Sequence, residues 1–195
     1  MTRKEQAAKT REILFNAAMD LLGTKPFEEI TVRDIVSKAG VSIGTFYNYY
    51  SSKLDVFYET YILADEFFES TVRQELETIS DGEEKVFLFF DYYARYSSEI
   101  TNLSLTRILY NTDNKYFDRN VSWGMHPLLI SIIKYGQENK TFRNDIPSEN
   151  ISKFLLISVR GQVYDWCTHD GSYNLRAAVK EQVKLLLESI NYKRA

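Results

Sequence analysis

The stretch AGVSIGTFYNYYSSK, residues 39–53, concentrates residue types that can contact a partner molecule. It holds two glycines four positions apart, four serine or threonine residues before its lysine, and four aromatic residues within five positions. Hydroxyl groups bind phosphate oxygens, and rings or methyl groups can lie against the methyl group of thymine. This combination favours a binding surface over a merely solvated segment.

The residues around this stretch supply the parts of a helix-turn-helix, in which two short helices are joined by a turn of three or four residues. Val32, Ile35 and Val36 give the first helix an apolar face. Gly40 can take the left-handed conformation that ends a helix, and Ser42 can cap the next one. Local sequence therefore predicts a helix, a tight turn and a second helix.

Phe46 and Tyr50 lie four positions apart and are expected to face the core. Six neighbours then lie off the core face: Ser42, Ile43, Thr45, Tyr47, Asn48 and Tyr49. Gly44 has no side chain and lets the backbone approach a DNA groove closely, while Lys53, at the start of the next helix, suits a phosphate. DNA is the favoured partner; a protein interface and simple core filling are the alternatives.

Composition and charge agree with a globular protein that contacts DNA at one end. The 195 residues are 44% hydrophobic and 26% charged, with a net charge of -3. Residues 1–53 carry eight basic and six acidic side chains, whereas residues 54–195 carry 16 basic and 21 acidic ones. A basic head on an acidic body is compatible with DNA contact, although the asymmetry alone is weak evidence.

Three features of the sequence lead us to expect a cytoplasmic protein. No apolar run of about 18 residues is present, which predicts no membrane span. The start of the chain, MTRKEQAAKTRE, is polar and basic, unlike a signal peptide. The single cysteine, Cys167, excludes an internal disulfide framework and fits a reducing compartment.

Apolar residues recur at spacings of three and four along the chain, which predicts an all-helical fold. Thr31 and Asp34 have the spacing of a capping box at a helix start. We expect two domains, a helix-turn-helix DNA-binding domain at 1–53 and a ligand-binding and dimerisation domain at 54–195. The helices are expected at 4–22, 31–38, 42–48, 52–78, 83–98, 101–111, 121–139, 148–168 and 173–191.

Residues 9–58 resemble the TetR, or tetracycline-repressor-like, family of bacterial transcriptional regulators. The resemblance is carried by TREILFNAAMDLLGTKPFEEITVRDIVSKAGVSIGTFYNYYSSKLDVF. It implies a three-helix DNA-binding domain followed by an all-helical regulatory domain. It also implies a homodimeric repressor that binds a palindromic operator in double-stranded DNA. A small-molecule effector would release the repressor from this operator.

The resemblance assigns roles to individual positions of the predicted helix-turn-helix. Carried over by position, the residues that hold phosphates are Thr31, Ser42, Thr45, Tyr49 and Lys53. Those nearest the bases are Ile43, Gly44, Tyr47 and Asn48. The family often has a basic or polar residue at position 43, so the isoleucine here favours an apolar contact over a hydrogen bond.

The last two expected helices are the candidates for the dimer interface. In the family the regulatory domains pair through a four-helix bundle, and Ser158 and Gly161 are small enough to let another helix approach. An ordinary monomer core is the alternative interpretation. The long helix expected at 52–78 runs from Lys53 into the aromatic-rich body, so it is the expected route from effector to DNA.

Polar and aromatic residues within the apolar helices are the candidates for an effector pocket: Tyr92, Tyr96, Arg107, Trp123, His126, Arg160 and Tyr164. Rings together with a cation favour a mostly apolar ligand that carries an acid group. For Arg160 the alternative is an internal ion pair with Asp165 or Asp91. For His126 it is an ordinary capping or core role.

The inventory of reactive side chains argues against an enzyme. Two histidines and one cysteine supply no set of nucleophile, base and orienting group. The run from Cys167 to His169 is too sparse for a metal site. We expect no catalytic residue, no metal and no cofactor. A helical adaptor without DNA binding is the competing function, and salt-dependent DNA binding would separate the two.

Overall fold

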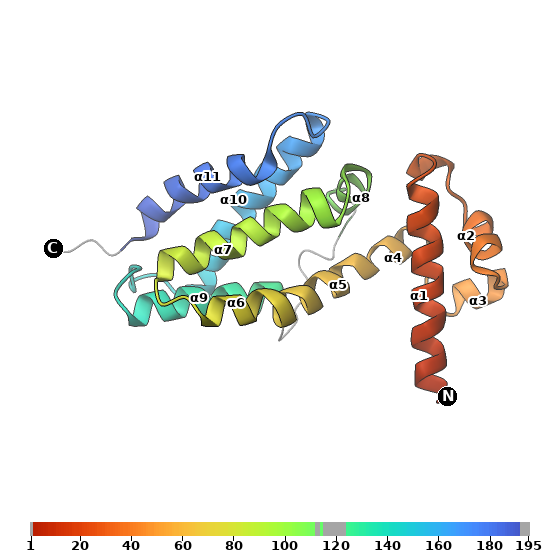
Figure 1. The fold of residues 1–195 in the computed structure, drawn as a ribbon, viewed down its shortest axis with the longest axis horizontal. Coiled ribbons are helices and arrows are strands. Elements are labelled where there is room, and N and C mark those ends of the chain that lie inside the picture. The colour runs from red at the N-terminus through yellow and green to blue at the C-terminus, as the bar shows by residue number, and fades with distance from the viewer. Residues whose placement is uncertain (1, 112–113, 115–123, 192–195) are drawn as a thin grey trace. The chain divides into compact units, whose positions relative to one another are not determined.

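The computed structural model describes residues 2–111, 114 and 124–191, and it is built from helices (Figure 1). The all-helical prediction is confirmed: in the described part of the chain, the strand-like pairing is confined to an isolated bridge between Phe142 and Asn191. The chain divides into two compact units. The first comprises Met1–Ile62 with Arg107–Phe117, and the second comprises Leu63–Thr106 with Asp118–Ala195.

The first unit is built on a long helix, α1 (Arg3–Leu22), against which α2 (Val32–Ala39) and α4 (Lys53–Phe57) pack. A short 3-10 turn, η1 (Phe27–Glu29), follows α1, and α3 (Ile43–Tyr47) packs on α2 (Figure 1). The fully buried side chains at the centre of this unit are Leu14, Ala18, Ile35, Phe46, Val56 and Phe57.

Caps and a left-handed glycine define the short helices of this unit. The hydroxyl of Thr31 accepts from the amide of Asp34, whose carboxylate accepts from the amide of Thr31, which is the capping box that the sequence predicts. Ser52 and Asp55 form the same arrangement at the start of α4. Gly40 ends α2 with a φ of 69°, a conformation that glycine adopts without steric cost.

The helix predicted at 52–78 is not uniform in the structure: it is interrupted at Tyr58 and widens at Phe68. After α4 the chain forms α5 (Glu59–Phe67), a π-helical turn η2 (Phe68–Val72), and α6 (Arg73–Glu77). The helix predicted at 83–98 likewise ends as α7 (Gly82–Arg95) followed by a π-helical turn η3 (Tyr96–Ile100). Such wide turns are often found at functional sites.

The helix predicted at 101–111 is shorter in the structure, as α8 (Leu103–Leu109). The second unit continues with α9 (Met125–Glu138), α10 (Ser148–Thr168) and α11 (Leu175–Ile190). Helix α7 packs against α9 and α11, and α10 packs against the same two helices (Figure 1). The core of the unit is apolar, with Phe68, Phe89, Leu129, Val159, Val163 and Val183 fully buried.

Within the described ranges, no helix combines the length and apolarity needed to cross a membrane.

Candidate nucleic-acid interface

Helix α3 and the three residues after it divide their side chains between the core and the solvent. Phe46 is fully buried and Tyr50 is 6% exposed, whereas Tyr47 is 56% exposed and Ile43 is 42% exposed. The phenol of Tyr50 donates to the carboxylate of Glu59 at 2.9 Å, which anchors the end of the helix-turn-helix to α5. Burial, followed by this hydrogen bond, raises the pKa of Tyr50. The inner face of α3 is thus anchored in the core, and its outer face is exposed.

The hydroxyl of Ser42 caps α3, and the hydroxyl of Thr45 is hydrogen-bonded to it. The amide of Thr45 donates to Oγ of Ser42 at 3.0 Å, and the two hydroxyl oxygens lie 2.9 Å apart. A hydroxyl can donate one hydrogen bond and accept two. One of the two hydroxyls donates to the other, so one O–H group stays available to donate to a phosphate oxygen.

Gly44 lies on the exposed side of α3, and the fold does not require it. A Cβ atom at this position would meet only Oγ of Ser42, at 3.7 Å, which is an ordinary contact. Its backbone is helical, so no left-handed conformation calls for glycine either. The space beside Gly44 is available to a partner.

Thr31 is committed to the architecture of α2. Its hydroxyl donates to the Asp34 carboxylate at 2.8 Å, and the same carboxylate accepts from Nζ of Lys25 at 2.8 Å. The bond from Lys25, with those from Thr31, lowers the pKa of Asp34 to about 2. Contact with a phosphate, as the resemblance implies, requires the hydroxyl to turn its one proton from Asp34 to the phosphate oxygen, because that oxygen can only accept.

Lys53 has a partner that its sequence neighbours do not indicate. Its Nζ donates to the carbonyl oxygen of Phe27 at 2.6 Å and lies 4.0 Å from the centroid of the Phe27 ring. Burial lowers the pKa of Lys53. The ammonium keeps two further donors for a phosphate. Its placement over η1 is fixed by a contact 26 residues away in the chain.

Arg11 is a candidate contact residue that the sequence pattern did not single out. Its guanidinium lies 5.9 Å from the centroid of the Tyr49 ring and 4.0 Å from the Glu59 carboxylate. It is therefore positioned beside one of the predicted phosphate contacts, Tyr49. The one signal for it in the sequence is the basic character of the first twelve residues, which does not distinguish Arg11 from its neighbours.

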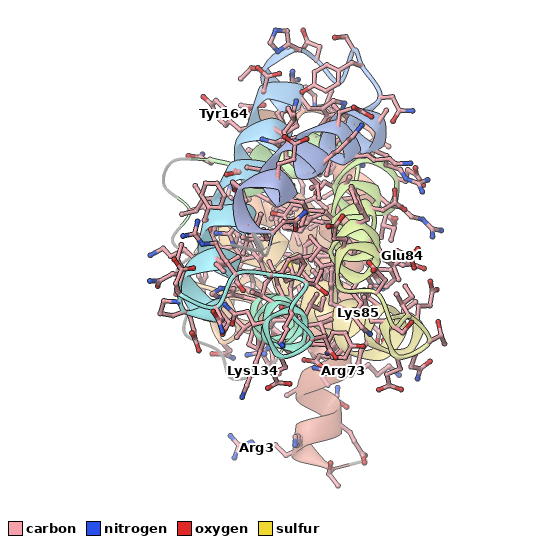
Figure 2. All side chains as sticks on the ribbon, turned by 90° about the vertical axis from the view of Figure 1, so that its left-hand side faces the viewer. Arg3, Arg73, Glu84, Lys85, Lys134 and Tyr164 are labelled. Carbon is pink, nitrogen blue, oxygen red and sulfur yellow. The ribbon has the colours of Figure 1, made fainter. Side chains whose placement is uncertain are left out.

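Helices α10 and α11 present exposed apolar side chains to solvent. Phe154, Ile157 and Tyr164 are 45%, 54% and 53% exposed on α10, and Leu185 is 68% exposed on α11. Figure 2 shows Tyr164 on the outer side of α10. Gly161 lies on the same face as Phe154 and Ile157, and a Cβ atom added to it would meet no atom within 4 Å. Clustered apolar residues of this kind mark an interaction surface.

The predicted effector residues on α7 and η3 meet around one phenylalanine. The ring of Phe67 lies 5.6 Å from that of Tyr92 and 5.5 Å from that of Tyr96. The phenol of Tyr92 donates to Glu75 at 2.5 Å. Burial, with the nearby charges of Asp65 and Glu66, raises the pKa of Tyr96 to about 12. The three rings form a packed aromatic cluster.

Four further effector candidates lie within the described residues: Arg107, His126, Arg160 and Tyr164. Burial, followed by the charge of Arg160, lowers the pKa of His126, so these two lie near each other. Tyr164 is exposed, and Arg107 is exposed in the first unit. Trp123 lies outside the described residues. A ligand-binding role for the seven predicted residues stays a prediction.

The carboxylates of Asp91 and Asp165, which were expected as ion-pair partners of Arg160, have other partners in the structure. Asp91 pairs with Arg176 at 2.7 Å. Asp165 accepts from the phenol of Tyr173 at 2.9 Å. Among the residues that the structure describes, no group of three His, Cys, Asp or Glu side chains is arranged to hold a metal ion.

A helix-turn-helix with an open second helix, followed by a helical unit with an exposed apolar face, defines a DNA-binding transcriptional regulator. Residues 14–60 match the family model of the bacterial regulatory proteins of the tetR family. The resemblance seen in the sequence is thus confirmed for the segment that carries the helix-turn-helix.

Solved structures share the fold over most of the chain. FadR of Thermus thermophilus, a TetR-family repressor in complex with lauroyl-CoA, is 26% identical with a TM-score of 0.74, covering 95% of this chain and 97% of that one. FadR of Bacillus halodurans, a fatty acid degradation regulator, is 22% identical with a TM-score of 0.71, covering 90% and 97%. FadR of Bacillus subtilis, in complex with stearoyl-CoA, is 18% identical with a TM-score of 0.73, covering 92% and 99%.

Tyr47→Ala is expected to weaken specific DNA binding by about 1–3 kcal/mol and to leave nonspecific binding unchanged. The ring is 56% exposed on α3, so its removal leaves the core intact. Fluorescence anisotropy with operator and scrambled DNA measures both affinities. Full operator affinity in the variant would rule out a base-reading role for Tyr47.

Lys53→Ala is expected to weaken binding to all DNA sequences and to reduce the slope of log K against log salt by about one. The reason is the loss of one ammonium that can contact a phosphate. Lys134→Ala, which removes an exposed lysine from α9, is the matched control and should leave the slope unchanged. Equal slopes for the Lys53 variant and the wild type would remove Lys53 from the interface.

Proposed function

We propose that this TetR-like regulator is a homodimeric repressor that binds a palindromic operator and is released from it by a small-molecule effector. The observation that carries the proposal is the outer face of α3, where Ile43 and Tyr47 are exposed beside a glycine that the fold does not need. A solvated helix has no use for this arrangement, whereas a major groove accommodates it.

The proposed contacts follow from the positions of the side chains in the first unit. Ile43, Gly44, Tyr47 and Asn48 would lie nearest the bases. Phosphates would be held by Thr31, Ser42, Thr45, Tyr49 and Lys53, with Arg11 added by its position beside Tyr49. We propose residues 1–53 as the DNA-binding domain and residues 54–195 as the ligand-binding and dimerisation domain.

The proposed dimer pairs α10 and α11 of one copy with the same helices of a second. Two α3 helices must reach successive major grooves, whose centres are about 34–36 Å apart, so binding requires a rigid pairing surface. The exposed side chains of Phe154, Ile157 and Leu185 supply apolar area, and Gly161 permits close approach of helices. Isologous pairing of this kind is the commonest symmetry of soluble oligomers.

For the effector we propose an apolar acyl chain joined to an acidic group, as in a thioester of coenzyme A. The support is the likeness to the Thermus thermophilus repressor, which was solved with lauroyl-CoA, together with the aromatic cluster of Phe67, Tyr92 and Tyr96. An effector releases DNA only if it binds the DNA-incompetent state more tightly. The helical run from α4 through α6 crosses the boundary between the units at residue 62 and is the proposed route of this coupling.

The experiment is a DNA-binding titration of the full chain with the DNA that flanks its own coding region. We expect salt-dependent, sequence-specific binding that falls when lauroyl-CoA is added, while free coenzyme A leaves it unchanged. Binding that ignores lauroyl-CoA would overturn the effector class and leave the DNA-binding proposal standing. Absence of any DNA binding would overturn the proposal as a whole and favour a helical adaptor.

We further propose that the protein acts in the cytoplasm, where its operator lies, and that its activity is regulatory and not enzymatic. The support is the family assignment, which is one of transcriptional regulators. No hydrolysis of lauroyl-CoA is expected over the course of the titration, and release of free thiol would count against this expectation.

A further inference from the structure

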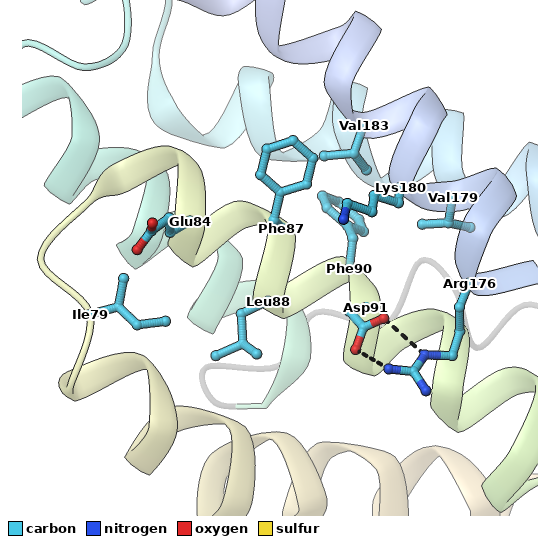
Figure 3. A pocket seen from close by; sticks show the side chains of 10 residues that line it. All are labelled: Ile79, Glu84, Phe87, Leu88, Phe90, Asp91, Arg176, Val179, Lys180 and Val183. Atoms are coloured by element: carbon cyan, nitrogen blue, oxygen red, sulfur yellow. Dashed lines mark hydrogen bonds and ion pairs between the residues drawn. The ribbon is translucent and has the colours of Figure 1, made fainter.

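A cavity opens between α7 and α11 in the second unit (Figure 3). Its volume is about 380 Å³, which lies within the usual range of small-molecule sites. None of the seven residues predicted to bind an effector lines it. Apolar side chains form most of its wall: Ile79, Phe87, Leu88, Phe90, Val179 and Val183.

An ion pair closes one end of this cavity. Nε and an Nη atom of Arg176 donate to the two carboxylate oxygens of Asp91 at 2.9 and 2.7 Å, as Figure 3 shows. The other Nη atom lies 3.4 Å from the Glu99 carboxylate. The guanidinium of Arg176 is therefore paired with carboxylates of the protein, and few of its N–H groups remain to bind a ligand.

Two more charged side chains line the cavity, and they differ in how their charge is compensated. Glu84 lies in the first turn of α7, where the amide ends of the helix stabilise a negative charge. Lys180 lies within α11, beyond its first turn, and makes no ion pair or hydrogen bond with the residues that the structure describes. Figure 3 shows Lys180 among the side chains that line the cavity.

We propose that this cavity binds an amphiphilic monocarboxylate, with the carboxylate on the ammonium of Lys180 and the apolar tail against Phe87 and Phe90. An unpaired cation above an apolar wall matches one anionic head joined to an apolar tail. Of the two carboxylates that line the cavity, Asp91 is already engaged by Arg176, and a cationic head placed on Glu84 would still be repelled by Lys180. The site shares no residue with the aromatic cluster of the proposed effector region and does not depend on DNA binding.

The test is isothermal titration calorimetry of the full chain, without DNA, with octanoate, octanol and octylamine. We expect octanoate to bind more tightly than either of the other two. Lys180→Met should weaken octanoate binding about tenfold, the loss of one charge-assisted hydrogen bond. Lys184→Met is the matched control, because Lys184 is an exposed lysine on the same helix that does not line the cavity, and it should leave the affinity unchanged.

A second variant tests the apolar part of the site. Leu88→Trp places a larger side chain in a half-buried wall position, so it should weaken octanoate and octanol alike while the thermal midpoint stays near that of the wild type. No octanoate binding to the wild-type chain would overturn the proposal. So would an equal loss in the Lys180 and Lys184 variants, which would show a general effect of charge. Neither result would bear on the DNA-binding proposal, because no DNA is present.

Discussion

Ile157→Glu is expected to convert the protein to a monomer and to abolish operator binding. Ile157 is 54% exposed at the centre of the α10 face, between Phe154 and Gly161 in sequence. In a symmetric dimer each substitution occurs twice, and each glutamate would be buried without a partner, at a cost of several kcal/mol per ion. A monomer can place only one α3 in a groove and loses the affinity gained from the second.

Multi-angle light scattering measures the oligomeric state, and anisotropy measures binding on the same samples. Ile100→Glu is the matched control, because Ile100 is also half exposed, at 49%. It lies at the end of η3 and belongs to neither of the proposed pairing helices, α10 and α11. The control should stay dimeric and bind the operator. A dimeric, operator-binding Ile157→Glu protein would show that the pairing surface lies elsewhere.

Gly44→Leu is expected to abolish operator binding while the free protein folds normally. The Cβ meets only Oγ of Ser42 at 3.7 Å, and leucine has a higher helix propensity than glycine, so the folded state is not penalised. The side chain would instead occupy the space into which we propose that a groove wall enters. The loss therefore comes from the complex and not from the fold.

Gly44→Ala is the graded control and should retain part of the affinity, because a methyl group occupies less of the groove than a leucine side chain. Thermal unfolding and circular dichroism establish that both variants are folded. Retention of wild-type affinity by the leucine variant would place Gly44 outside the interface. A large drop in its thermal midpoint would instead give Gly44 a structural role that the contacts do not show.

Local signals in the sequence predicted the helix-turn-helix well. The capping box of Thr31 and Asp34, the left-handed Gly40 and the cap at Ser42 each depend on residues within four positions of one another. The helix predicted at 148–168 has the observed bounds of α10. Its start is specified by Pro147, which stands just before its first residue. Elements of this kind are specified by short-range chemistry.

Features that depend on long-range packing were not predictable from spacing. The π-helical turn η2 begins at Phe68, which packs against Phe89, a contact that helical periodicity does not encode. The partner of Asp91 is Arg176, 85 positions away, and not the arginine expected from composition. Tyr164 was expected inside a cavity because its helix is apolar, yet it lies on the exposed face of that helix.

A symmetric pair of α3 helices that reads DNA should leave a characteristic footprint on the DNA flanking the coding region. We expect protection of two inverted half-sites whose centres lie about 10–10.5 base pairs apart, or a multiple of that, with each protected stretch facing the major groove. The footprint of Tyr47→Ala should require more protein, and Gly44→Leu should leave no footprint. A footprint of the same extent and affinity with Gly44→Leu, or unprotected DNA with the wild-type dimer, would refute this mode of DNA reading.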